Sequence, residues 1–141
     1  MSKNELSNET SFFGDVVYTY TRAQAIADGV LVDVTDIARE AGFQRPVAMT
    51  DAAWHDCVAW SDDDSAAQVY QDETGRLWDV LTMAMFAIRR QRTPVQVLNF
   101  DLMRVPRDGH TTQPITATLK LMIGAGDEGL PVLTILLPSE D

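Results

Sequence analysis

Two stretches decide the fold: Arg76-Leu-Trp-Asp-Val-Leu-Thr-Met-Ala-Met-Phe-Ala-Ile-Arg-Arg-Gln91 and Ile115-Thr-Ala-Thr-Leu-Lys-Leu-Met-Ile123. The first is apolar nearly all round at its centre and ends in arginines, which suit the carbonyl end of a helix dipole. It predicts a long central helix over 76–91. In the second, apolar residues alternate with Thr116, Thr118 and Lys120. This period of two predicts a half-buried strand.

Working outward, alternation predicts further strands at 95–104 and 131–137. Gly124-Ala-Gly-Asp-Glu-Gly129 matches the letters of a dinucleotide fingerprint, but a strand pattern follows it instead of a helix, so we expect a hairpin turn. Before the central helix, cap residues and glycine stops predict short helices at 22–27, at 36–41 and from Thr50 or Asp51 onward. Brief extended pieces are expected at 30–32 and at Arg45-Pro46. The polar run 61–65 reads as an interruption between helices.

The predicted fold class is therefore α+β, with N-terminal helices packed on a C-terminal antiparallel sheet of three or more strands. The chain has 141 residues, of which 45% are hydrophobic, so one domain with a real core is expected. Residues 1–15 are polar and aperiodic and are predicted to form a flexible N-terminal tail. Residues 16–141 are predicted to form a single α+β domain.

Composition excludes several classes of protein. The N-terminus lacks a signal-peptide pattern and no apolar run approaches the ~20 residues of a membrane span, so we expect no membrane contact. The single cysteine, Cys57, excludes an internal disulfide and fits a reducing cytoplasm. The formal charge of −10 repels phosphate backbones and attracts basic surfaces, so a basic protein partner is expected and direct nucleic-acid binding is not.

The acids concentrate between residues 51 and 79, where eight of them accompany a single arginine, Arg76, whereas residues 89–107 are rich in arginine. Such asymmetry predicts a face that docks on a basic protein surface. Its candidate partner-binding residues are the following: Asp62, Asp63, Asp64, Asp72, Glu73, Trp60 and Tyr70. Tryptophan and tyrosine are included because they are enriched at binding hot spots. The alternatives are a solvated surface with internal ion pairs and, for each aromatic residue, a place in the core.

The case for catalysis or a metal is weaker. His55 and Cys57 diverge by about 200° on a helix and form no dyad. His110 and Cys57 remain a catalytic alternative if the fold brings them together. Asp62, Asp64 and Glu73 match part of a calcium loop, but Ala66 and Ala67 replace a ligand and the turn glycine, so a solvated acidic loop is the preferred interpretation. We therefore predict no catalytic residue, no metal site, no cofactor and no enzymatic activity.

Tyr20-Thr-Arg-Ala-Gln-Ala-Ile-Ala-Asp-Gly-Val-Leu-Val-Asp-Val34 and Tyr70-Gln-Asp-Glu-Thr-Gly-Arg-Leu-Trp-Asp79, together with Ile37-Ala-Arg-Glu-Ala-Gly-Phe43 and Leu136-Leu-Pro-Ser-Glu-Asp141, resemble an uncharacterised protein family. Its members are carried on bacterial plasmids and integrative conjugative elements. The resemblance covers about residues 18–141 and implies no activity or functional residue.

The resemblance does imply that the gene lies on a mobile element, and mobile elements carry small acidic proteins that block host defences, including anti-CRISPR proteins. The expectation drawn from it is an inhibitor that binds backbone subunits of a type I (I-F) CRISPR surveillance complex and blocks or disrupts it. Two alternatives stay open. One is a small enzyme that uses His110 or His55 with carboxylates, and the other is a scaffold protein of mobile-element maintenance.

Overall fold

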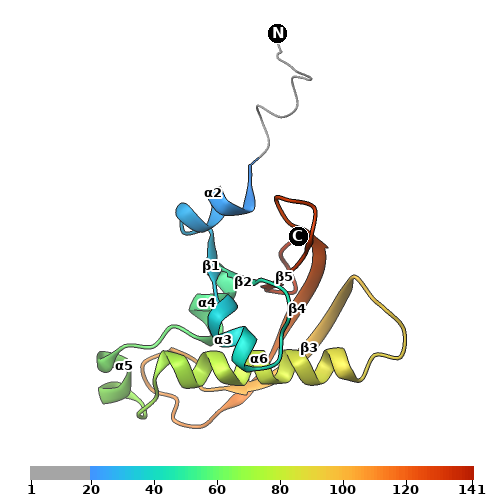
Figure 1. Ribbon diagram of the computed structural model, residues 1–141. Helices are drawn as coiled ribbons and strands as arrows, with labels where there is room; N and C mark the ends of the chain where they lie inside the picture. Colours follow the sequence, from blue (N-terminus) through green and yellow to red (C-terminus); the bar gives the residue numbers. More distant parts are fainter. Residues whose placement is uncertain (1–19) are drawn as a thin grey trace.

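The computed structural model describes residues 20–141. The predicted N-terminal tail, residues 1–15, lies outside them. Helices and strands alternate over residues 22–50, three helices follow, and three strands come last (Figure 1). Their bounds are α2 Arg22–Ala27, β1 Leu31–Asp33, α3 Thr35–Glu40, β2 Val47–Thr50, α4 Asp51–Cys57, α5 Asp62–Ala67, α6 Glu73–Arg89, β3 Val97–Arg104, β4 Ile115–Ala125 and β5 Pro131–Leu136.

The five strands form one sheet in the order β1-β2-β5-β4-β3. All neighbours are antiparallel except β2 and β5, which run parallel with Ala48 opposite Thr134. The α+β class is thus confirmed. The sheet has two more strands than the three predicted in the C-terminal half, because the two brief extended pieces of the N-terminal half form β1 and β2. It is mixed and not purely antiparallel, because β2 runs parallel to β5. Strands β1 and β2 add to the free side of β5.

The predicted turn at 124–129 is confirmed as the connection of the β4–β5 hairpin. Gly126 N–H donates to the Leu130 carbonyl at 2.7 Å, and Gly129 adopts a φ of +81°, a left-handed value that favours glycine. No helix starts here, so the glycines do not cradle a pyrophosphate group.

Helix α6 begins three residues earlier than predicted. The Asp72 carboxylate accepts a hydrogen bond from Gly75 N–H at 2.7 Å and so caps the helix from position 72. The helix packs on β3 and against α3 and α4. It buries one face, and Trp78 and Phe86 on its outer face are 42% and 48% exposed. The predicted long helix is present, but its apolar residues are not buried all round, because no element in the described part of the chain covers that outer face.

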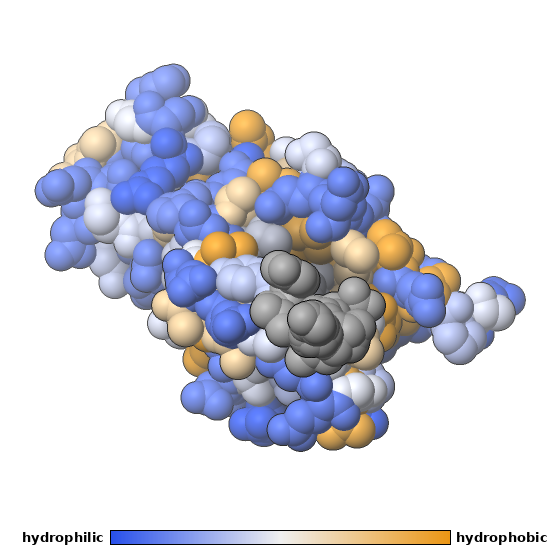
Figure 2. Space-filling model, turned by 90° about the horizontal axis from the view of Figure 1, so that it is seen from above, coloured by the Kyte–Doolittle hydropathy of each residue, from blue (hydrophilic) through white to orange (hydrophobic). Residues whose placement is uncertain are grey.

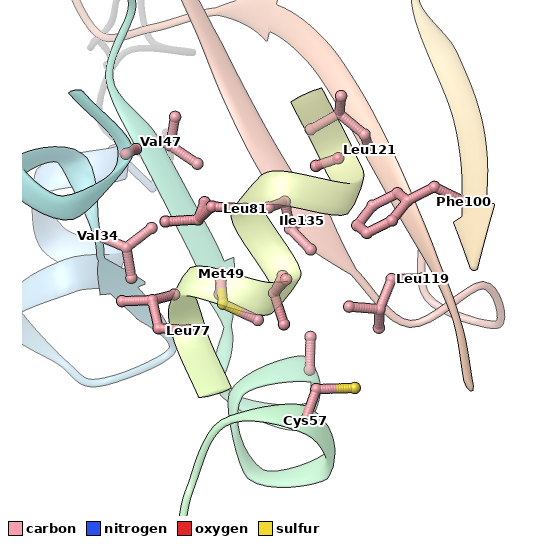
Figure 3. Close-up of a cluster of buried hydrophobic side chains, with 14 of the residues drawn as sticks. Val34, Val47, Met49, Cys57, Leu77, Leu81, Phe100, Leu119, Leu121 and Ile135 are labelled. Atoms are coloured by element: carbon pink, nitrogen blue, oxygen red, sulfur yellow. The ribbon is translucent and has the colours of Figure 1, made fainter. Parts of the chain in front are cut away.

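The core fills the space between α6 and the sheet (Figure 3). Its largest fully buried side chains include Met49, Leu81, Leu119, Leu121 and Ile135. Leu119 and Leu121 lie on the inward face of β4, as the alternation predicts. Burial of this apolar layer is the main stabilising term for the domain.

At the other end of the molecule, α2 is fastened to the sheet by polar contacts. Arg22 donates from Nη1 to Thr134 Oγ1 at 2.8 Å and from Nη2 to the Leu133 carbonyl at 2.7 Å. The Asp127 carboxylate accepts from the backbone N–H groups of Arg22 and Ala23, which lowers the pKa of Asp127. Seen from above, this end of the molecule is mostly hydrophilic with small apolar groups (Figure 2).

Candidate functional site

The predicted acidic residues gather at the starts of two successive helices. Asp62, Asp63 and Asp64 form the first turn of α5, and Asp72 and Glu73 open α6. Carboxylates are stabilised at helix N-termini because the N–H groups and the helix dipole present positive charge there. The structure therefore gives this acidic cluster a local cause, and it replaces the predicted loop at 61–65 with a short helix.

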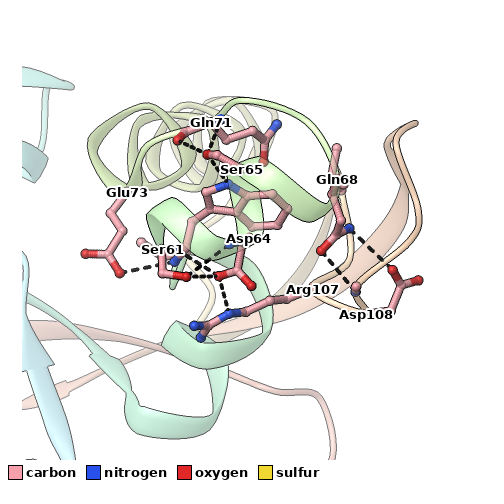
Figure 4. Close-up of polar contacts among 12 residues, drawn as sticks. Ser61, Asp64, Ser65, Gln68, Gln71, Glu73, Arg107 and Asp108 are labelled. Carbon is pink, nitrogen blue, oxygen red and sulfur yellow. Dashed lines mark hydrogen bonds and ion pairs between the residues drawn. The ribbon is translucent and has the colours of Figure 1, made fainter.

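Ser61 explains why α5 forms. Its hydroxyl accepts from Asp64 N–H at 3.2 Å, while the Asp64 carboxylate accepts from Ser61 N–H at 2.7 Å, which is a capping box. Arg107 Nε donates to the same carboxylate at 2.6 Å (Figure 4). Desolvation opposes ionisation of Asp64, but the hydrogen bonds from Ser61 and Arg107 outweigh it and hold the pKa below its ordinary value.

Trp60 lies beneath this surface and is 6% exposed, so it belongs to the interior. Its indole Nε1 donates to Ser65 Oγ at 3.0 Å, and Ser65 Oγ donates to the Gln71 carbonyl at 3.2 Å. Its backbone N–H donates to the Glu73 carboxylate at 3.2 Å, which ties α6 to the segment before α5. Of the two aromatic candidates, Trp60 supports the site from below and cannot contact a partner directly.

Arg76 is the charged residue that the structure buries here, at 5% exposed. Nε donates to the Val58 carbonyl at 3.0 Å, Nη1 donates to the Val105 carbonyl at 2.9 Å and to Gln71 Oε1 at 2.6 Å. The guanidinium lies 4.5 Å from the centroid of the Trp60 ring, within cation–π range. Desolvation lowers the pKa of Arg76. One arginine thus links three segments that are separate in sequence.

We call this interlocked set the polar corner; it comprises Trp60, Ser61, Asp64, Ser65, Gln71, Arg76 and Arg107. Gln68 extends it to the loop after β3. Its Nε2 donates to the carbonyls of Pro106 at 2.7 Å and Thr111 at 2.6 Å, and its Oε1 accepts from Gly109 N–H at 3.1 Å. Figure 4 shows Gln68 beside Asp108, to which Nε2 also donates at 3.3 Å.

Tyr70 sits on the polar corner with its side chain 78% exposed. The backbone on either side of it is fixed, since Gln68 is bound to the 106–111 loop and Gln71 to Ser65 and Arg76. Asp62, Asp63, Asp72 and Glu73 are also exposed. The structure therefore presents one large aromatic side chain between two hydrogen-bonded residues, Gln68 and Gln71, next to two acidic helix starts.

The basic segment 89–107 is only partly separate from the acids. Arg104 binds the Asp56 carboxylate at 3.0 Å, and Arg107 binds Asp64. These are the internal ion pairs of the alternative interpretation. Arg89 and Arg90 are exposed at the far end of α6. Some of the acidic charge is thus neutralised internally, while Asp62 and Asp63 remain on the surface.

The structure places the histidines at the surface. His55 Nε2 pairs with Asp51 at 3.1 Å, and the ring of His110 contacts Asp108. Cys57 is 1% exposed, and burial, followed by the adjacent Asp56 carboxylate, raises the pKa of its thiol to about 12. A thiol held protonated in the core is a poor nucleophile. The geometry therefore gives no support to a cysteine-based reaction.

The partial calcium loop is not formed, because residues 62–67 are helical. Within residues 20–141, no group of three or more histidine, cysteine, aspartate or glutamate side chains is arranged to hold a metal ion. No helix in that range is long and apolar enough to cross a bilayer.

Sequence reasoning missed Ser65, Gln68 and Arg76. The spacing Ser61-x-x-Asp64 was a usable signal for a capped helix. A lone arginine among eight acids reads as a surface residue, and its burial depends on the carbonyls of Val58 and Val105, which are distant in sequence.

Comparison with known proteins gives one relationship. The model of a family described as "Family of unknown function (DUF6573)" matches residues 9–141. No curated protein and no solved structure matches the chain.

Proposed function

The chain belongs to this family of unknown function, and from that premise we propose that it acts by binding a basic protein surface, as an inhibitor of a type I CRISPR surveillance complex. The binding site is the surface around Tyr70 and the two acidic helix starts. The proposed location is the bacterial cytoplasm, where such complexes operate.

One observation carries the proposal: Tyr70 is 78% exposed although its backbone is held on both sides. An aromatic residue in a mobile segment loses backbone and side-chain freedom when it is bound, whereas one on a held backbone loses mainly side-chain freedom. Tyrosine is also a preferred hot-spot residue, because it combines apolar area with a hydroxyl group. Tyr70 is thus a preorganised anchor.

Charge selects the kind of partner. Exposed Asp62 and Asp63 at the α5 start, with Asp72 and Glu73 at the α6 start, favour a surface rich in lysine or arginine. Backbone subunits that grip guide RNA present such a surface. The resemblance to proteins of plasmids and integrative conjugative elements supports the choice of a defence complex as the target.

The test is a binding assay with purified type I-F surveillance complex and a matching DNA duplex. The variant Asp62→Asn/Asp63→Asn/Tyr70→Ala removes the anchor and two charges but leaves the Asp64 capping box intact. The control variant Asp28→Asn/Glu128→Gln removes two exposed charges from the opposite, α2 end of the molecule. It matches the loss of net charge.

We expect the wild-type chain and the control to bind the complex and to reduce DNA binding. The triple variant should bind at least about tenfold more weakly, since a single hot-spot tyrosine contributes on the order of 2 kcal/mol. Equal weakening of binding by the control variant would show that the effect comes from overall charge and not from this site. Full inhibition by the triple variant would exclude this site, and absence of any binding to the complex would exclude the proposed target.

A further inference from the structure

Strand β3 is an edge of the sheet within the described residues, with β4 as its neighbour on one side. Ile123 N–H donates to the Gln96 carbonyl at 2.8 Å, and the register continues with Leu98 opposite Leu121. In an antiparallel ladder, hydrogen-bonded pairs alternate with pairs that are not bonded. The backbone groups of Val97, Asn99, Asp101 and Met103 therefore point outward from the edge. Four of the eight residues of the strand therefore present backbone groups that have no partner among residues 20–141.

The side chains of the same four residues are exposed, with Val97 at 49% and Met103 at 54%. Their order along the strand is apolar, amide, carboxylate, apolar. We propose that β3 pairs antiparallel with β3 of a second copy of this chain, about a two-fold axis through Phe100. Val97 then faces Met103 of the second copy, and Asn99 faces its Asp101. The edge is complementary to itself, as a two-fold interface requires.

Other registers fit less well. A shift of one residue would set outward-pointing backbone groups against inward-pointing ones. A shift of two residues in one direction places the two copies of Asp101 opposite each other, and like charges in that position destabilise a ladder. The opposite shift places Val97 against Asp101. Asp101 would ordinarily discourage edge pairing, but in the register centred on Phe100 it meets an amide that can donate to it.

The surface beside the edge is also suited to a second copy. A groove of about 490 Å³ lies between α6 and β3, lined by Thr82, Met83, Leu102 and Met103 among others. In the proposed register Leu98 of the second copy falls opposite Leu102, on the face of the sheet that α6 covers. Leu98 is half-buried and packs on the core, so its remaining apolar surface meets the apolar side of the groove.

Charge along the interface is complementary. Asp79 lines the groove near the end of β3. Arg89 and Arg90 lie at the end of α6, and the segment that follows them leads to the start of β3 (Figure 1). A two-fold axis reverses the second copy, so its Arg89 and Arg90 approach the part of the groove where Asp79 of the first copy lies. Such opposition favours the antiparallel dimer over a peptide of arbitrary sequence.

The association is measured by sedimentation equilibrium of the full chain, from low micromolar to several hundred micromolar. We expect a mass that rises toward twice the 15.6 kDa of one chain. Asn99→Asp sets carboxylates opposite each other at two symmetric places and should weaken association by about tenfold or more. The swap Asn99→Asp/Asp101→Asn restores a carboxylate facing an amide at both places and should recover the wild-type affinity.

A cross-link checks the register. Directly opposite residues of a hydrogen-bonded pair are about 5.5 Å apart at Cα, within disulfide range. Asn99→Cys/Asp101→Cys should form a covalent dimer under mild oxidation, and Asn99→Cys alone should not. A chain that stays monomeric throughout would overturn the proposal. So would a dimer that Asn99→Asp does not weaken, or one that the paired cysteines fail to link. None of these outcomes depends on binding at Tyr70.

Discussion

The start and the middle of α6 are held in place by different kinds of interaction. At its start, the helix is capped by Asp72 and is held by the polar corner, in which the buried guanidinium of Arg76 binds the carbonyls of Val58 and Val105. Along its middle, Leu81 and Ala84 pack on the sheet with no polar contact. Apolar contacts are non-directional and tolerate a change of shape, whereas hydrogen bonds in a buried site depend on each partner. The polar corner should therefore be specific and fragile, and the apolar layer adaptable.

The largest effect should come from Arg76→Met. Methionine has an unbranched side chain of similar length, but it lacks the guanidinium and so leaves the carbonyls of Val58 and Val105 without their buried donor. We expect the free energy of unfolding to fall by about 3–5 kcal/mol, measured by urea denaturation. Arg76→Lys should recover little, because an ammonium group cannot reproduce the geometry of the guanidinium. Stability close to wild type in the methionine variant would mean that the corner is held mainly by packing.

Leu119→Ala tests the apolar layer. Leu119 is fully buried on β4, so truncation should lower the free energy of unfolding by about 3 kcal/mol through lost burial and a cavity. Leu119→Met retains the volume and should cost less than about 1.5 kcal/mol. At Arg76, by contrast, even the conservative change to lysine is expected to be harmful, and this difference distinguishes the polar corner from the apolar layer most clearly. Equal losses for both Leu119 variants would show that this layer is as exacting as the polar corner.

Acid should loosen the polar corner before the apolar layer. The pKa of Asp64 is lower in the folded chain, so its contribution is complete above the ordinary value near 4 and is lost as the pH falls through the depressed value. We expect the Trp60 indole N–H resonance, which reports the bond to Ser65, to shift or exchange faster below pH 4. Methyl resonances of Leu119 should change less.

Asp64→Asn is the control, because an amide cannot ionise. It should remove this part of the acid dependence. An unchanged titration of the Trp60 signal in Asp64→Asn would assign the effect to another carboxylate, such as that of Asp108, whose pKa is lowered by hydrogen bonds from Thr111 and His110.

The smallest effect on stability should come from Tyr70→Ala. The side chain is mostly exposed, and surface changes away from buried networks usually alter the free energy of unfolding by less than about 0.5 kcal/mol. Urea denaturation of this variant beside Arg76→Met distinguishes a residue that is only exposed on the surface from one that stabilises the fold. A loss above about 1 kcal/mol would mean that the tyrosine is part of the polar corner and not an anchor resting on it.

Much of the fold could be predicted because its signals are local. The apolar spacing of 76–91 and the alternation of 115–123 each report one element, and both elements are present. Helix α5 was missed because its acids read as a loop by composition, although Ser61 and Asp64 carry a capping pattern. The parallel pairing of β2 with β5 has no local signal, since it depends on contacts between residues near 47 and near 133.

The candidate site divides in the same way. The concentration of acids was visible in the sequence, and so was a tyrosine beside them, but the sequence left open whether Tyr70 lies in the core or on the surface. The burial of Arg76 was not visible, because the carbonyls that satisfy it come from the segments after α4 and after β3. The burial of Trp60 was not visible either, because it depends on Ser65 and Glu73, which lie in helices α5 and α6. A sequence pattern reveals which residues could meet a partner, but the network that fixes them exists only after the chain has folded.

The position of β5 has a consequence for synthesis. β5 occupies the middle of the sheet, yet it is made after the four strands that surround it. On the ribosome, β2 and the β3–β4 ladder are therefore complete while each still lacks its central neighbour. The two parts of the sheet can join only when residues 131–136 have left the exit tunnel. Until β5 is in place, the edges of β2 and β4 that it will join present unpaired backbone N–H and C=O groups, which can pair with other nascent chains.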